Sequence, residues 1–157
     1  MLKATLKHVP LLAGYLHDAE FSVSDLVLDR ERKTLALTLL RVCYEKPEKG
    51  RFLWVLPVIR HPWMKSRLTL TGVQSVAQQD LRGASQGEPC MLLDIVQPAM
   101  TTLELQATTA LIRAEVSSDT GILIEDLGEP REGTRVIDFR RPAFTAMQEI
   151  EALRQDG

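Results

Sequence analysis

The segment from Leu16 to Tyr44 constrains the fold more than any other part of the chain. Apolar and polar residues alternate around Phe21 and again from Leu35 to Leu39, which is the pattern of half-buried β-strands. A charged run over residues 29–33 separates the two stretches. The segment therefore predicts a long β-hairpin with a polar turn.

The alternation in this hairpin changes phase twice, near Ser24 and Asp25 and again near Leu39 and Leu40. A shift of one residue turns every following side chain to the other face of the sheet, so a β-bulge is expected at each place. Bulges bend and twist a strand. We therefore expect the hairpin to curl.

Other apolar runs predict further strands, and Gly72 predicts a third bulge within one of them. These runs lie at residues 52–59, 68–76, 91–96, 103–105, 110–116 and 122–124, with a strand or extended arm at 136–139. Pro10 opens a short N-terminal helix, because proline is tolerated in the first helical turn. Pro142 opens a C-terminal helix whose apolar stripe is Phe144, Met147, Ile150 and Leu153.

These elements predict an α+β fold that is mainly antiparallel β. We expect about seven or eight strands in a curled meander, roll or open barrel, with a short N-terminal helix and a C-terminal helix. Strands do not alternate with helices along the chain, which argues against a doubly wound parallel sheet. The length of 157 residues fits a single domain over residues 1–157.

Composition excludes several classes of protein. With 45% hydrophobic and 25% charged residues, the chain resembles a folded globular protein. A formal net charge of -2 lacks the cationic excess of a nucleic-acid binder, so nucleic acid is not an expected partner. No apolar run reaches the roughly 18 residues that span a bilayer, so no membrane association is expected.

The two cysteines, Cys43 and Cys90, lie in apolar runs without CxxC spacing. This pattern favours two buried thiols in a reducing compartment, although a disulfide between paired strands stays open. Lys7, His8 and Pro10 interrupt the apolar N-terminal stretch, which is unlike a signal peptide. We therefore expect a cytoplasmic protein.

The segment Leu16–Glu45 resembles the bacterial family described as domain of unknown function 2948. The resemblance rests on Leu16, Asp18 and Ala19 at a helix end, the strand to Leu26, the turn at residues 30–33 and the strand over residues 35–41. Residues 67–76 and 122–128 are similar to later strands of that family. Residues 54–63, the glycine-rich loop after Gln78 and the C-terminal helix lie outside it. The resemblance implies a fold and a bacterial origin, and no activity.

His17 and Asp18 are the most suggestive pair for chemistry, and they form the predicted pocket. In one interpretation His17 is a general base, because its pKa lies near neutrality, with Asp25 or Asp94 in the same pocket. In the favoured interpretation both are structural, with Asp18 satisfying the backbone at the helix exit. Neighbouring residues at a helix end point in different directions, so we do not expect His17 and Asp18 to form a His–Asp dyad with each other.

No metal or cofactor site is predicted. The three histidines, His8, His17 and His61, lack the spacing of metal ligands, and neither cysteine has a histidine nearby in sequence. The segment Gly83–Gly87 lacks the lysine and the following helix of a phosphate-binding loop. No catalytic residue is assigned.

One basic and aromatic cluster is the candidate interaction surface. It comprises Phe52, Trp54, Arg60, His61, Trp63 and Arg67. Pro57 confines the strand beside it to a sheet edge or a bulge. Such an edge can accept a partner, and its cations can equally protect it from unwanted pairing.

The sequence thus predicts a non-catalytic protein-interaction or scaffold domain that binds a protein partner or a second copy of itself. Two alternatives stay open. The LHDA sequence before a hairpin also occurs in small immunity-type proteins, which bind toxins. An enzyme with a pocket near His17 is the other alternative.

Overall fold

The structure is a computed structural model that describes residues 1–46, 48–52, 56–81, 87–131 and 135–136. Within these residues there are one α-helix, α1 (Val9–Leu16), and two 3-10 helices, η1 (Leu6–His8) and η2 (Val23–Asp25). The strands of the first half are β1 (Leu2–Thr5), β2 (Glu20–Ser22), β3 (Leu26–Asp29), β4 (Thr34–Val42), β5 (Glu48–Phe52), β6 (Leu56–Arg60) and β7 (Trp63–Thr71). Those of the second half are β8 (Val73–Asp80), β9 (Pro89–Ala99), β10 (Thr102–Ala107), β11 (Ala110–Val116), β12 (Gly121–Asp126) and β13 (Arg135–Val136).

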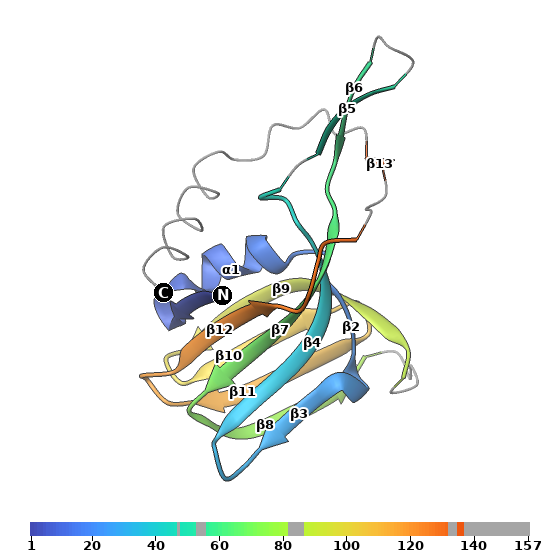
Figure 1. The fold of residues 1–157 in the computed structure, drawn as a ribbon. Coiled ribbons are helices and arrows are strands. Elements are labelled where there is room, and N and C mark those ends of the chain that lie inside the picture. Colours follow the sequence, from blue (N-terminus) through green and yellow to red (C-terminus); the bar gives the residue numbers. More distant parts are fainter. Residues whose placement is uncertain (47, 53–55, 82–86, 132–134, 137–157) are drawn as a thin grey trace.

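Ten of these strands form one antiparallel sheet. Its order is β1-β12-β7-β4-β2-β9-β10-β11-β8, and β3 pairs with β4 beside this path. The sheet folds over on itself, so that β12, β7, β4 and β3 form one layer and β9, β10 and β11 lie behind it (Figure 1). The layers join at β2, where Glu20 pairs with Leu40 of β4 and Phe21 pairs with Cys90 of β9.

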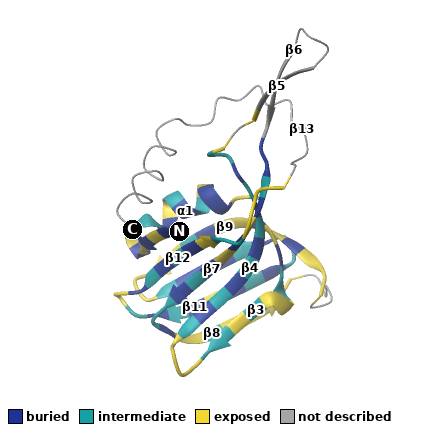
Figure 2. Ribbon diagram, viewed as in Figure 1, coloured by how far each residue is buried: buried dark blue, intermediate teal, exposed yellow. Residues whose placement is uncertain are grey.

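The hydrophobic core lies between the layers. Alternate side chains of β4 point inward, so Leu35, Leu37 and Leu39 are buried. They belong to one apolar cluster with residues of the other layer, among them Leu103, Leu105, Ile112 and Ala114. Figure 2 shows this alternation as dark and light bands along the strands. Each buried leucine contributes roughly 1.5–3 kcal/mol to folding.

Helix α1 packs its apolar side onto this core through Leu12, Tyr15 and Leu16. Pro10 lies in the first turn, where its missing N–H interrupts no hydrogen bond. The predicted N-terminal helix is therefore confirmed. It ends at Leu16, and the next residue, His17, has φ -55° and ψ 139°, outside the helical region.

Gly72 is the bend through which the chain passes from β7 in one layer to β8, which pairs with β11 in the other. Its φ of 69° lies in the left-handed region that glycine adopts without strain. A Cβ at this position would collide with Oγ of Ser117, whose N–H donates to the Gly72 carbonyl. Where a third bulge was predicted, at Gly72, the structure therefore has a corner between the two layers.

The two predicted bulges in the hairpin have different outcomes. At Ser24 and Asp25 the chain forms the 3-10 helix η2, which separates β2 from β3 and accounts for the change of phase. The prediction of a bulge at Leu39 and Leu40 is wrong, because β4 pairs with β7 in unbroken register from Thr34 to Val42. The inward phase continues through Leu39 to Arg41, so an arginine occupies a core position.

The mainly antiparallel β fold is confirmed, whereas the number of strands was underestimated. Short strands at residues 2–5 and 48–52 were not predicted. A meander describes β9–β10–β11, but most other neighbours in the sheet are distant in sequence. The predicted C-terminal helix lies outside the described residues, and so the single domain over residues 1–157 stays a prediction.

Strands β5, β6 and β13 form a second sheet of three strands in the order β13-β6-β5. In Figure 1 the β5–β6 hairpin stands away from the folded ten-stranded sheet. The chain enters this hairpin from β4 and leaves it into β7. Strands β4 and β7, which flank the hairpin in the sequence, are paired with each other from Thr34 and Thr71 to Val42 and Trp63.

Candidate functional site

A depression of about 520 Å³ opens beside the C-terminal end of α1. Three elements line it: α1, the corner after β4, and β9. The lining residues are Ala13, Gly14, His17, Tyr44, Leu93 and Asp94. A Cβ placed on Gly14 would meet nothing within 4 Å, so the helix leaves open space there.

A bulge in β9 aims two consecutive side chains outward at this depression. Gln106 of β10 pairs with Asp94, and the next residue, Ala107, pairs with Leu92. Leu93 is therefore the extra residue, and both Leu93 and Asp94 are exposed while Leu92 is buried. Bulges commonly redirect side chains beside binding sites.

His17 and Asp18 touch each other, contrary to the sequence expectation. His17 Nδ1 lies 3.1 Å from Asp18 Oδ2, and both side chains are about half exposed. The expectation assumed helical geometry, but the helix ends at His17 and Asp18 adopts a φ of 63°. The Asp18 N–H donates to the Leu92 carbonyl at 2.9 Å, which fixes this corner against β9.

The structure brings His17 and Asp94 to the same depression, as the enzyme interpretation requires. Asp94 Oδ1 accepts a hydrogen bond of 2.8 Å from the N–H of Ile95. Asp25 is part of η2 and does not line the depression. An imidazole oriented by a carboxylate can accept and return a proton.

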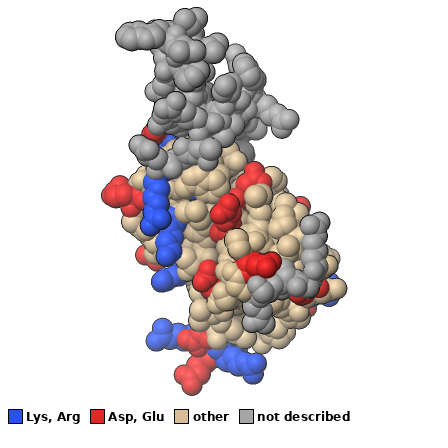
Figure 3. Space-filling model, turned by 90° about the vertical axis from the view of Figure 1, so that its right-hand side faces the viewer, with Lys and Arg blue, Asp and Glu red and all other residues tan. Residues whose placement is uncertain are grey.

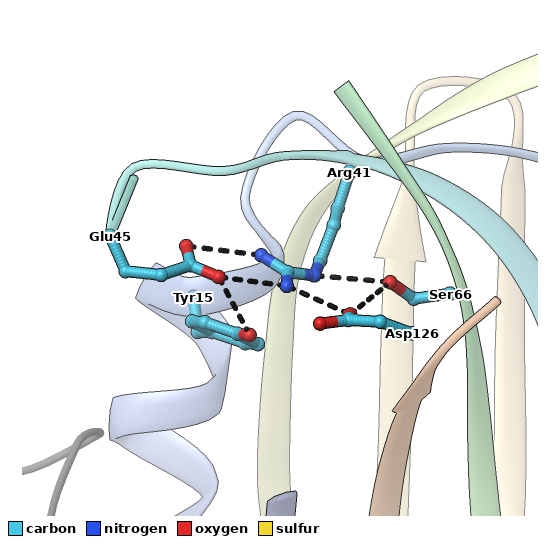
Figure 4. Close-up of polar contacts among 5 residues, drawn as sticks. All are labelled: Tyr15, Arg41, Glu45, Ser66 and Asp126. Carbon is cyan, nitrogen blue, oxygen red and sulfur yellow. Dashed lines mark hydrogen bonds and ion pairs between the residues drawn. The ribbon is translucent and has the colours of Figure 1, made fainter. Parts of the chain in front are cut away.

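A buried polar cluster lies where the chain leaves β4 for the β5–β6 hairpin, and Figure 4 shows its five side chains. Its centre is Arg41, whose side chain is fully buried. The guanidinium donates to both carboxylate oxygens of Glu45, at 3.1 and 2.8 Å, and to Asp126 at 2.9 Å. Its Nε donates to Ser66 Oγ at 3.1 Å, and that hydroxyl donates to Asp126. Sequence reasoning missed this cluster.

Tyr15 closes the cluster from the side of α1. Its hydroxyl donates to Glu45 Oε1 at 3.1 Å, and its ring stacks on the Arg41 guanidinium. Burial alone would lower the pKa of Arg41, but hydrogen bonds to Glu45 and Asp126 and the nearby Tyr15 raise it above its ordinary value. Arg41 therefore stays charged, and the cluster joins α1, β4, β7 and β12.

Cys43 and Cys90 are both free and buried, as the favoured interpretation predicted. Burial raises the pKa of the Cys43 thiol to about 11, although the positive charge of Arg41 opposes that shift. Burial also raises the pKa of Cys90. Thiols of this kind are poor nucleophiles at neutral pH.

The structure places the residues of the predicted interaction surface in different environments. His61 is buried, packs against the Tyr44 ring at 5.1 Å between centroids, and has no hydrogen-bond partner for Nδ1. Trp63 is half-buried and pairs with Arg131, while Arg67 is exposed on β7. Phe52 and Arg60 end β5 and β6, with side chains outside the described residues. Trp54 lies outside them entirely.

Within the part of the chain that the structure describes, no group of three or more His, Cys, Asp or Glu side chains is arranged to hold a metal ion. None of the described helices combines the length and the apolar character needed to cross a bilayer.

No protein-family model, curated protein or solved structure matches the chain. The resemblance to the family described as domain of unknown function 2948 therefore stays a prediction. Function has to be argued from the geometry of the site.

Proposed function

We propose that the chain is a non-catalytic interaction domain that binds another protein over β9 and the adjoining depression. The observation that carries the proposal is the exposure of Met91 and Leu93, 37% and 45% respectively. They lie two residues apart on the same face of β9, and Leu93 also lines the depression.

Exposed apolar side chains are ordinary when they are scattered. These two lie on the same face of one strand, beside a concave site, which is the arrangement of an apolar contact with a partner. Two free buried thiols agree with the cytoplasmic location that we infer. Arg41 and Glu45 pair where the chain leaves β4 for the β5–β6 hairpin, and this hairpin, which stands away from the folded sheet (Figure 1), is a second candidate surface.

Photocrosslinking in cells tests the proposal. The full chain carries p-benzoylphenylalanine in place of Leu93, and a matched chain carries it in place of Gln78, which is exposed on β8. We expect one discrete adduct from position 93 and none from position 78. A chain that stays monomeric in sedimentation and gives no adduct at position 93 would contradict the proposal.

An enzyme is the second candidate, because His17 is oriented by Asp18 and shares the depression with Asp94. This candidate predicts hydrolysis of an activated ester such as p-nitrophenyl acetate, beyond the rate of free imidazole at equal concentration. The excess would disappear in His17→Gln and stay in His8→Gln. An interaction domain predicts no excess in either chain.

A further inference from the structure

We propose that the depression binds an arginine or lysine side chain of the partner polypeptide. The inference rests on the proposed interaction function and names the chemistry of the partner. Its walls combine a carboxylate, Asp94, with an aromatic ring, Tyr44, and aliphatic groups, Leu93 and Ala13. A long cationic side chain has the matching parts, an apolar stem and a charged end.

Two acidic side chains lie on the strands that border the depression. Strands β2 and β9 contain no Lys or Arg, and their acidic side chains, Glu20 and Asp94, are exposed. Glu20 pairs with Met91, so it borders the exposed apolar residues. Figure 3 shows Lys and Arg side chains in a run along one side of this face, with some Asp and Glu side chains beside them and others over the rest of the face. Strands β2 and β9 are therefore acidic, although the whole chain is nearly neutral.

The same chemistry already binds a cation inside this protein. Arg41 stacks on the Tyr15 ring and pairs with the carboxylates of Glu45 and Asp126. In the depression, Tyr44 and Asp94 supply one ring and one carboxylate. His17 is held at Nδ1 by Asp18, and a neutral imidazole in that arrangement leaves Nε2 to accept a hydrogen bond from a guanidinium.

Geometry also distinguishes a side chain from a free small molecule. Among the described residues, six from three elements line the depression, and a Cβ on Gly14 would meet nothing within 4 Å. Small-molecule sites usually enclose most of the ligand surface. A side chain needs less enclosure, because its backbone and neighbours contact the surrounding surface. Met91 and Leu93 provide that apolar surface.

A peptide titration followed by amide chemical shifts tests the inference on the full chain. The probe is the blocked tripeptide leucine–arginine–leucine, and its matched control replaces arginine with the neutral isostere citrulline. We expect arginine to shift the amides of Gly14, His17, Tyr44 and Asp94, with citrulline weaker. Exposed ion pairs contribute about 0.2–1 kcal/mol, so Asp94→Asn is expected to weaken binding up to about fivefold.

A control variant and four contrary results complete the test. Glu31→Gln, on the exposed β3–β4 turn, is expected to leave the titration unchanged. Equal shifts with citrulline, no effect of Asp94→Asn, or equal binding of free arginine would overturn the inference. Shifts at the same amides that depend on protein concentration without peptide would also overturn it, by showing a second copy as the occupant. A photocrosslink at position 93 would still support the interaction function in each case.

Discussion

The guanidinium carbon of Arg41 lies 4.3 Å from the centroid of the Tyr15 ring, so a cation from β4 stacks on an aromatic side chain of α1. The same guanidinium reaches Glu45 and Asp126. Helix, sheet and the base of the β5–β6 hairpin are therefore joined by one charged group. We expect this junction to hold α1, and with it one wall of the depression, in place.

Replacing Arg41 by methionine is expected to destabilise the protein by about 3–5 kcal/mol, because Glu45 keeps a buried charge without its partner. Urea unfolding at neutral pH measures the free energy of unfolding. The control is Arg67→Met on the exposed face of β7, where about 0.5 kcal/mol or less is expected. Equal effects of the two substitutions would show that the cluster contributes no stability.

Cys43 predicts a loss of stability at alkaline pH. Its folded pKa of about 11 exceeds the ordinary value of 9.0, so the unfolded chain releases this proton first. The stabilising contribution is complete below pH 9.0 and declines as pH rises toward 11. Between pH 8 and pH 10 the wild type should therefore lose more unfolding free energy than Cys43→Ala. An identical loss in both chains contradicts this prediction.

Two glycines are expected to respond in opposite directions to alanine. Gly14→Ala should stabilise the protein by roughly 0.5–1 kcal/mol, because alanine favours the helix and the added Cβ meets nothing. Gly72→Ala should destabilise it by more than about 1 kcal/mol, because φ is positive and the Cβ meets Ser117. Thermal unfolding of both variants, compared with the wild type, gives the two signs.

The bulge in β9 predicts a sharp contrast between neighbouring leucines. Leu92→Ala should cost about 2–5 kcal/mol, because Leu92 is fully buried in the core. Leu93→Ala should change the free energy of unfolding by about 0.5 kcal/mol or less, because its side chain faces solvent. Chemical denaturation distinguishes the two. Similar costs would place Leu93 inside and remove the apolar surface.

Much of the strand pattern could be predicted from the sequence, because alternation reports burial directly. The β10–β11 hairpin follows from Leu103 and Leu105 facing Ile112 and Ala114. The N-terminal helix could be predicted because proline, here Pro10, is tolerated in the first helical turn. Which strands pair could not be predicted, since β1 with β12 and β2 with β9 are contacts between distant segments.

The candidate site was harder to predict because it depends on exceptions to alternation. Arg41 continues the inward phase of Leu35, Leu37 and Leu39, yet the apolar Leu40 suggested a slip. A strict period of two would have placed Arg41 in the core. A buried arginine needs polar partners, so this placement would have led to a search for them. The bulge at Leu93 is set by pairing with β10, and the sequence of β9 alone carries no sign of it.

Oxidation of methionines by hydrogen peroxide tests the central claim most directly. Met91 and Met100 are both exposed, but Met91 lies beside Leu93 on the proposed contact surface. If a partner covers β9, Met91 of the full chain should oxidise more slowly in cell extract than in the purified protein, relative to Met100. An unchanged Met91 to Met100 ratio in extract, with the protein intact and folded, would contradict the proposed interaction surface.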